Sequence, residues 1–272
     1  MRSVFSAGLL DGFIDNNFKP FDLSIGVSAG AFNLLAFNAN ETQKGFDFFR
    51  RLSTDKDFFS FSRFIKGGHL LDLEYVDKLI FEDSSFNIQK AFDHSAPMYF
   101  TLTNVETGKA EYLQANVDNY RQLLKASAAL PLVYRDFPLI NNTPMTDGGV
   151  ANGIPVDKAI DLGATKIMVV RARHARYTKK DTLVHKYIRW QLNKHSSLVK
   201  TMRQRIAIYN RSLTLIRQPP AGVKIIEICP PQNFSIAKLS RSPAALDTGY
   251  QLGLVQAEQA IRQWNESRLP AV

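Results

Sequence analysis

The sequence predicts an α/β layered fold, and three stretches of the chain carry that prediction. A helical pattern, a short apolar strand, a glycine-flanked turn and a second helical pattern follow one another within the first forty residues. Residues 97–114 are rich in β-forming side chains on either side of the turn sequence ETGK. Residues 165–172, TKIMVVRA, contain an apolar run typical of a strand that is buried on both faces. Such alternation of helices and strands is characteristic of α/β proteins.

The N-terminal half divides into elements by its periodicity. Residues 4–14 carry apolar side chains at helical spacing, and DLSIGV, residues 22–27, has the pattern of a short buried strand. Helical character returns at residues 29–40. The two β-rich runs around ETGK predict a hairpin or sharp turn, and residues 119–130 predict a further helix.

The C-terminal half continues the alternation. PVDKAIDLGA, residues 155–164, predicts a helix with Gly163 near its C-terminus. A strand is expected at residues 223–230, and a closing helix from about Pro243 to Glu266. Because there is no internal repeat and no low-complexity linker, we expect one domain over residues 1–272. Within it we expect a basic helical segment at about 175–217 and a C-terminal strand plus helix at 223–266.

The basic segment carries most of the positive charge. The formal net charge is +9, but residues 171–217 hold thirteen Lys and Arg against the single Asp181, a net +12 that leaves −3 for the rest of the chain. Any anionic partner is therefore expected to bind there. Between residues 199 and 216 apolar side chains recur every three or four positions, which predicts an amphipathic helix with a basic exposed side. Packing of this helix on the body is favoured, and contact with lipid is the alternative.

Composition excludes several classes of protein. The only cysteine is Cys229, so an internal disulfide and a cysteine-rich metal site are excluded, and the five histidines form no HExxH pair. We therefore expect no metal and no cofactor. No apolar run approaches the roughly 18 residues of a membrane span, and Asp11 and Asp15 interrupt the apolar core that a signal peptide needs. A cytoplasmic protein is the expectation.

The stretch IGVSAGAFN, residues 25–33, is the strongest candidate for a catalytic motif. Ser28 stands between Gly26 and Gly30, after a predicted strand and before a predicted helix. A tight turn of this kind exposes a serine hydroxyl, and glycine is expected at both places because a β-carbon there would collide with backbone. The helix that begins at Ala29 directs unpaired amides toward the serine and supports an oxyanion. The alternative is that Ser28 is simply a small residue in a strand-to-helix turn.

A second candidate motif is TDGGVANGIPV, residues 146–156. Asp147 precedes Gly148 and Gly149 in a loop ahead of a helix, from which a carboxylate can be directed at another loop. Taken alone, DGG favours an ordinary turn. Together with the serine motif and with KASAALP upstream, the pattern favours a site.

These motifs together resemble the patatin-like phospholipase family, in particular its bacterial acyl hydrolases. The matching pieces follow the family's order over nearly the whole chain: RSVFSAGLLDGF, GVSAG, GGHLLDLEYV, TNVETGKAEYL, KASAALP, TDGGVANGIPV and IYNRSLTLI. The resemblance implies a three-layer α/β/α fold with a central, mostly parallel sheet. It also implies serine-dependent hydrolysis of lipid acyl esters, of the phospholipase or lysophospholipase and carboxylesterase type, by a Ser-Asp dyad. Ser28 matches the family's nucleophile and Asp147 its partner carboxylate.

A dyad fits the distribution of histidines. A Ser-His-Asp enzyme would need one histidine close to Ser28, and none stands in a recognisable motif. Seven phenylalanines between residues 46 and 64 either line a groove for an acyl chain or form ordinary core, and core is favoured.

The N-terminus departs from the family pattern. Family members begin with a strand and a glycine-rich GGGxRG loop whose amides form the oxyanion hole, whereas this sequence starts at Met1-Arg2-Ser3, aligned with the last three positions of that loop. The missing strand is expected to leave an unpaired sheet edge or a hole in the core. Either the protein extends upstream or it is a member that folds without turnover, and we favour the first. The second predicts a lipid- or anion-binding protein, with peripheral contact to an anionic inner membrane surface. Nucleic-acid binding is disfavoured because no recognised module accompanies the charge.

Overall fold

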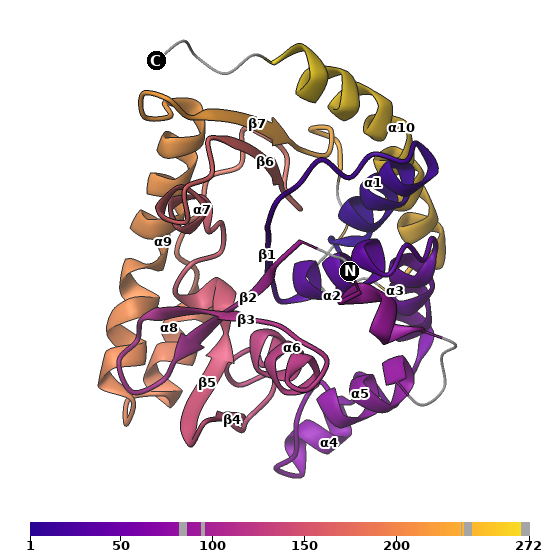
Figure 1. The fold of residues 1–272 in the computed structure, drawn as a ribbon. Coiled ribbons are helices and arrows are strands. Elements are labelled where there is room, and N and C mark those ends of the chain that lie inside the picture. Colours follow the sequence, from indigo (N-terminus) through magenta and orange to yellow (C-terminus); the bar gives the residue numbers. More distant parts are fainter. Residues whose placement is uncertain (82–85, 94–95, 235, 237–240, 268–272) are drawn as a thin grey trace.

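The structure, a computed structural model, describes residues 1–81, 86–93, 96–234, 236 and 241–267. Helices lie on both sides of the strands, so the α/β class and the three-layer arrangement are confirmed (Figure 1). The helices are α1 Val4–Asp15, α2 Ala29–Asn38, α3 Lys44–Thr54, α4 Phe61–Ile65, α5 Leu73–Phe81, α6 Tyr120–Ala128, α7 Val156–Asp161, α8 Leu183–Gln191, α9 Ser196–Arg217 and α10 Pro243–Glu266, with two 3-10 turns, η1 Ile88–Ala91 and η2 Gly148–Val150.

The strands form two sheets within the described residues. They are β1 Ser24–Val27, β2 Met98–Asn104, β3 Ala110–Gln114, β4 Leu139–Ile140, β5 Thr143–Asp147, β6 Lys166–Val170 and β7 Lys224–Ile228. The larger sheet has the order β1-β2-β5-β4, with β3 also paired to β2, and the smaller sheet is β6-β7. Only β1–β2 and β6–β7 are parallel, while β2–β3, β2–β5 and β4–β5 are antiparallel. The expectation of a mostly parallel sheet is therefore corrected to a mixed one.

Two tight reversals account for antiparallel pairs. The predicted ETGK hairpin joins β2 to β3, and its Gly108 has a φ of +70°. Asn141 and Asn142 connect β4 to β5 with φ values of 50° and 62°, the left-handed conformation that two-residue hairpin loops require. Asparagine tolerates this conformation better than most residues, so the local sequence supports the turn.

β1 lies at an edge of the larger sheet. In the described part of the chain it pairs with β2 on one side only, so an unpaired edge, the first of the two expected alternatives, is present. Ile25 of β1 belongs to the same apolar cluster as Ile167 and Val169 of β6. Side-chain packing therefore joins the two sheets.

α1 and α10 pack closely against each other. A β-carbon at Gly8 would lie 2.1 Å from the carbonyl oxygen of Tyr250, and one at Gly253 would lie 2.2 Å from that of Phe5. Only glycine fits where backbones approach this closely. The buried carboxylate of Asp11 accepts a hydrogen bond from the Tyr250 hydroxyl at 2.7 Å. The C-terminal helix is thereby fixed to the first helix of the chain.

α9 extends over the predicted amphipathic segment and begins three residues earlier. Leu198, Met202, Leu213 and Ile216 are buried on its inner side, which confirms that the helix packs on the body. Arg203 lies on its exposed side, as expected.

The aromatic side chains between residues 46 and 64 do not share one environment. Phe49 and Phe58 are buried, as the favoured interpretation expects. Phe61 on α4 is 61% exposed, so the core interpretation is wrong at this position. Helix α4 has only five residues and no buried side chain, and its Ile65 is 71% exposed as well.

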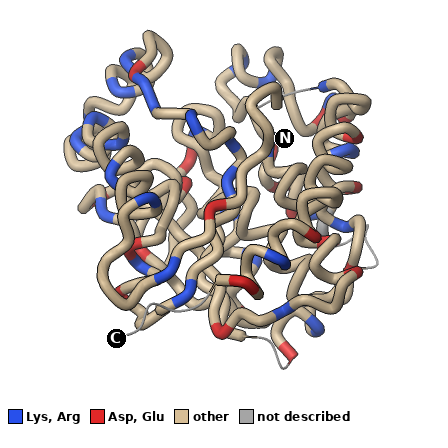
Figure 2. The backbone as a smooth tube through the Cα atoms, turned by 90° about the horizontal axis from the view of Figure 1, so that it is seen from above, with Lys and Arg blue, Asp and Glu red and all other residues tan. Residues whose placement is uncertain are grey.

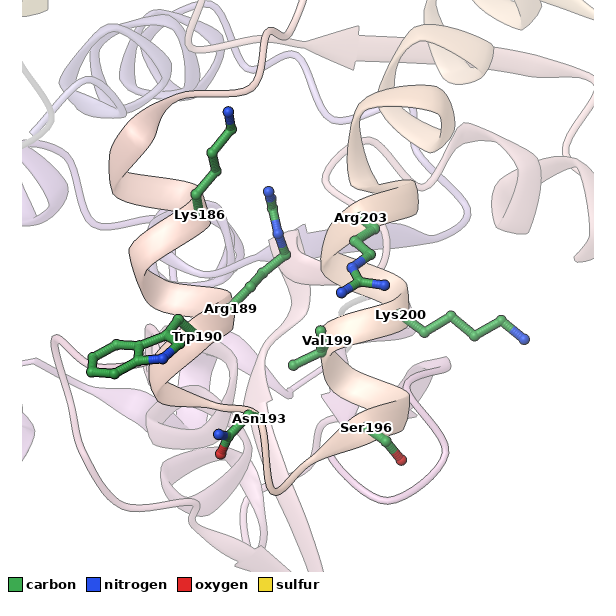
Figure 3. A pocket seen from close by; sticks show the side chains of 8 residues that line it. All are labelled: Lys186, Arg189, Trp190, Asn193, Ser196, Val199, Lys200 and Arg203. Carbon is green, nitrogen blue, oxygen red and sulfur yellow. The ribbon is translucent and has the colours of Figure 1, made fainter.

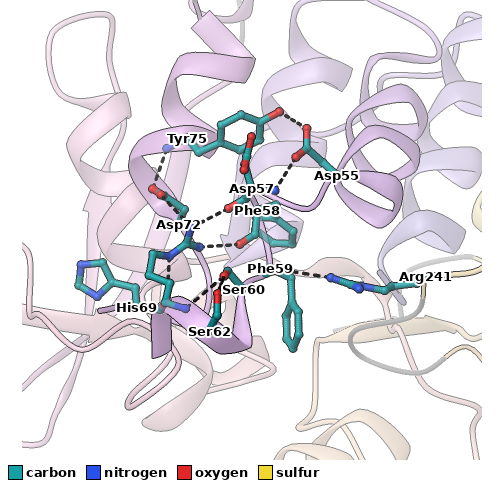
Figure 4. A network of polar contacts seen from close by, with 11 residues as sticks. Asp55, Asp57, Phe58, Phe59, Ser60, Ser62, His69, Asp72, Tyr75 and Arg241 are labelled. Carbon is teal, nitrogen blue, oxygen red and sulfur yellow. Dashed lines mark hydrogen bonds and ion pairs between the residues drawn. The ribbon is translucent and has the colours of Figure 1, made fainter. Parts of the chain in front are cut away.

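Polar contacts hold the chain between α3 and α5 (Figure 4). The Tyr75 hydroxyl donates to the Asp55 carboxylate, and the amide of Tyr75 donates to Asp72 at 3.0 Å. Arg241, ahead of α10, donates to the Phe59 carbonyl at 3.1 Å. This region is therefore attached to the C-terminal part of the chain as well as to its neighbours in sequence.

Candidate active site

Ser28 occupies a strained turn between a strand and a helix. β1 ends at Val27, α2 begins at Ala29, and Ser28 between them has φ +54° and ψ −125°. Few residues other than glycine adopt a positive φ, and such a conformation persists only where the surroundings impose it. The Ser28 side chain is half-buried. The structure thus has the turn geometry that an exposed nucleophilic serine requires.

The two glycines of the motif have different surroundings. A β-carbon at Gly26 would lie 2.5 Å from Cα of Ala31, so only glycine fits there. A β-carbon at Gly30 would meet no heavy atom within 4 Å. The expectation that backbone contacts require glycine at position 30 was therefore wrong, because the space beside the first turn of α2 is open. That open space lies next to Ser28.

A side chain of α6 holds the turn in place. The amide of Ser28 donates to Oγ of Ser127 at 2.9 Å, and the Ser127 hydroxyl donates to the Thr101 carbonyl at 2.8 Å. Ser127 is fully buried. No role was predicted for the KASAALP stretch from the sequence. In the structure its Ser127 orients the backbone at Ser28.

Asp147 ends β5 and is only 3% exposed. Its Oδ1 accepts a hydrogen bond from the Gly149 amide at 2.8 Å. The Asp147 amide donates to the Ala129 carbonyl at 3.0 Å, and the Asp147 carbonyl accepts from the Thr103 hydroxyl at 2.9 Å. Backbone and carboxylate are thus both held in one orientation.

The two glycines after Asp147 both lie in crowded positions. A β-carbon at Gly148 would lie 2.1 Å from the Thr101 carbonyl oxygen, so only glycine fits. A β-carbon at Gly149 would lie 2.9 Å from Oδ1 of Asp147 and 3.7 Å from Cγ1 of Val27. Gly149 therefore lies between the aspartate and the strand that leads to the serine.

The register of the sheet brings Ser28 and Asp147 to the same edge. Val27 pairs with Thr101 of β2, and Asp147 pairs with Leu102, the next residue of β2. β3 pairs with residues 99–103 on the other side of β2, so β1 and β5 lie end to end along the same side of β2. Ser28, which follows Val27, is thereby brought close to Asp147. Val27 and Asp147 face consecutive residues of β2, and a strand rises about 3.3 Å per residue, so the ends of β1 and β5 are neighbours. No hydrogen bond joins the two side chains in the described structure, and catalytic hydrogen bonds are often long before a substrate binds.

The histidines of the described chain have contacts elsewhere. His69 stacks on a tyrosine ring at 4.0 Å, and His195 packs edge-on against a phenylalanine at 5.0 Å. The ring partner is Tyr134 for His69, Phe137 for His195 and Tyr177 for His174. His185 lies beside the carboxylate of Asp181. Within the described residues none of these four contacts Ser28 or Asp147, and His94 lies outside those residues.

Arg205 on α9 is a site residue that sequence reasoning missed. Its Nε donates to the Gly149 carbonyl at 3.1 Å. Burial lowers the pKa of Arg205, and the negative charge of Asp147 opposes that shift. A largely buried cation therefore stands close to the Asp147 carboxylate. The sequence feature that could have indicated Arg205 is its spacing. It follows Thr201 by four residues, so it shares the face of the amphipathic helix on which Thr201 is buried.

Comparison with known proteins identifies the family. The family model described as Patatin-like phospholipase matches residues 1–160, and this chain belongs to that family. A second model, described as Domain of unknown function (DUF6363), matches residues 195–267, which include α9 and α10. The chain is also 31% identical over 257 residues to "Uncharacterized protein YjjU" of Escherichia coli (strain K12), an alignment that covers 93% of this chain and 72% of that protein.

A helix that crosses a bilayer must be about 20 residues long and predominantly apolar. Over the described residues, none of the helices is both long and apolar enough to cross a membrane. This agrees with the lack of a long apolar run in the sequence.

Proposed function

We propose that this chain is a serine-dependent lipid acyl hydrolase that cleaves fatty-acyl esters with Ser28 as nucleophile and Asp147 as base. The observation that carries the proposal is that a strained serine and a buried aspartate lie near each other at the facing ends of β1 and β5, on the same side of β2. Membership of the patatin-like phospholipase family supports an acyl ester of a lipid, a phospholipid or lysophospholipid among them, as the substrate.

The reaction proceeds in two halves. Asp147 accepts the proton of the Ser28 hydroxyl while Oγ attacks the ester carbonyl carbon. The tetrahedral intermediate collapses, the C–O bond to the alcohol breaks, and the alcohol leaves with the proton from Asp147. Asp147 then accepts a proton from water, whose oxygen attacks the acyl carbon, and Ser28 leaves with that proton. The balance is one ester and one water consumed, with one fatty acid and one alcohol formed.

Charges on both sides of the dyad support this chemistry. Ala29 and Gly30 are the first two residues of α2, so their amides have no hydrogen-bond acceptor within the helix. These amides and the positive end of the helix dipole favour an oxyanion beside Ser28. On the other side, Arg205 holds the Gly149 carbonyl, and we assign it to positioning of the Asp147 loop. Its two terminal amino groups donate to no described residue and are available to an anionic group of the substrate.

A second candidate function is lipid or anion binding without turnover. The observation that favours it is that the Ser28 hydroxyl and the Asp147 carboxylate form no hydrogen bond with each other in the described structure. The net charge of +12 over residues 171–217 would then serve an anionic partner.

Hydrolysis of a chromogenic acyl ester by wild type, Ser28→Ala and Asp147→Asn tests the hydrolase proposal. Each substitution is expected to lower kcat on the order of a thousandfold or more, because each removes a group that takes part in bond exchange. Asparagine retains an oxygen for the Gly149 amide, so Asp147→Asn removes the base and preserves the turn. Equal rates in all three proteins would end the proposal.

Ser24 in the same strand offers a matched control. Ser24→Ala changes a hydroxyl three residues from the end of β1 and is expected to leave kcat unchanged. A fluorophosphonate probe should label wild type and Ser24→Ala but not Ser28→Ala. Absence of labelling in wild type, together with retained lipid binding, would support the second candidate.

A further inference from the structure

α8 presents an apolar face to solvent. None of its residues is buried, and Leu183, Val184, Tyr187 and Trp190 are 80%, 65%, 54% and 66% exposed. Leu183, Tyr187 and Trp190 are spaced by four and three positions, so they lie on one side of the helix. Single exposed apolar side chains are common, but four on one short helix indicate an interaction surface.

Cations border this apolar face. Lys186 of α8 and Lys200 and Arg203 of α9 line a hollow of about 580 Å³ between the two helices, beside Trp190 (Figure 3). In the part of the chain that the structure describes, these three cations form no ion pair. Arg189 differs because Asp181 binds it with two hydrogen bonds of 3.0 and 2.8 Å. Lys and Arg gather on the side of the molecule that holds α8 and α9 (Figure 2).

Exposed aromatic side chains next to unpaired cations favour a lipid surface as the partner. Trp and Tyr favour the boundary between water and hydrocarbon, where a ring is buried and its polar edge remains hydrated. Lys and Arg near an anionic bilayer add attraction to the lipid phosphates. A second copy of the chain fits less well, because its equivalent face would bring another segment of net +12 against the first.

We propose that the apolar face of α8 and the cations of the α8–α9 hollow form a docking surface for an anionic membrane. α8 would lie in the plane of the headgroups with its apolar side chains inserted. The lipid contact is thereby assigned to α8, since the apolar side of α9 is buried against the body. This inference goes beyond the proposed hydrolase activity and does not depend on it.

Vesicle binding by the whole chain tests the proposal. We expect binding to vesicles of phosphatidylcholine mixed with phosphatidylglycerol, and at least about tenfold weaker binding to phosphatidylcholine alone or at high salt. The exposed fraction is 66% for Trp190 and 9% for Trp264, so a shift of tryptophan emission to shorter wavelength reports mainly on α8.

Matched substitutions locate the surface. The double variant Leu183→Ser with Trp190→Ser is expected to bind mixed vesicles at least about tenfold more weakly, because both side chains would be buried in the bilayer. Val255→Ser is the control, since Val255 is 77% exposed on α10, away from α8 in Figure 1, and its binding should equal that of wild type. Ser28→Ala should also bind as wild type, which separates this result from the hydrolase test.

Three results would overturn the proposal. The first is the absence of binding to the mixed vesicles by wild type, and the second is an equal loss in the double variant and in Val255→Ser. The third is a wild-type dimer in the absence of lipid that the double variant abolishes, because α8 would then contact a second copy of the chain.

Discussion

The α1–α10 and α8–α9 helix pairs differ in how much of their contact is buried. α1 and α10 approach until Gly8 and Gly253 have no room for a side chain. α8 and α9 enclose a hollow of about 580 Å³ and leave Trp190 66% exposed. Glycines permit close contact between backbones, whereas the Lys and Arg side chains that line the α8–α9 hollow favour contact with water at their charged ends.

This difference separates stability from surface function. We infer that the α1–α10 contact supports the fold, because it is closely packed and includes the buried Asp11. α8 has no buried residue, so its outer side chains are free to serve another partner. Three measurements of unfolding free energy test whether the two pairs differ in this way.

The largest effect is expected from Gly8→Ala on α1. Alanine is the better helix former by about 1 kcal/mol, so propensity alone would stabilise the variant. The added β-carbon would lie 2.1 Å from the Tyr250 carbonyl oxygen, and we expect a net loss of about 3 kcal/mol from overpacking, measured by urea unfolding. Gly30→Ala on α2 is the control, since its β-carbon has open space, and it should not lose stability. Equal results for the two variants would mean that α1 and α10 are not in close contact.

An intermediate effect is expected from Asp11→Asn at the same contact. Burial raises the pKa of Asp11 to about 6, although hydrogen bonds from Tyr250 and Gln43 oppose the shift. The folded protein therefore favours the protonated carboxyl, and this contribution to stability is present below about pH 4 and lost as the pH rises through about 6. Asparagine stays neutral and still accepts both hydrogen bonds.

The expected result is a change in relative stability with pH. Asp11→Asn should gain about 2 kcal/mol over wild type between pH 4 and pH 7, measured as the difference between two unfolding free energies. Taking the difference cancels the pH-dependent contributions to stability of the carboxylates that the two proteins share. A difference that is the same at both pH values would contradict burial of Asp11. Asp15→Asn, at an exposed position of the same helix, should change stability by less than about 0.5 kcal/mol.

The smallest effect is expected on α8. Leu183→Ser with Trp190→Ser should change the free energy of unfolding by no more than about 0.5 kcal/mol per substitution, because both side chains are exposed. Leu198→Ala on α9 is the contrasting variant, since Leu198 is fully buried, and it should lose about 2 to 5 kcal/mol. A large loss from the α8 variant would show that its outer face is covered in solution.

Local patterns were enough to predict most of the elements. The closing helix runs over Pro243–Glu266 as expected, because proline in its first turn and an unbroken apolar period mark it. The predicted hairpin is present because ETGK places glycine where a positive φ is needed. The direction of β5 and the division into two sheets were not predictable, since they depend on pairing between segments that are distant in sequence.

The candidate site divides in the same way. The sequence by itself determined where the strained serine lies and which aspartate precedes two glycines, because turn geometry is set by neighbouring residues. Only the tertiary structure decided that β1 and β5 meet on the same side of β2, that position 30 has open space, and that Arg205 reaches the Gly149 carbonyl. Sheet register and the packing of α9 settle these contacts, and both arise from interactions across the whole chain.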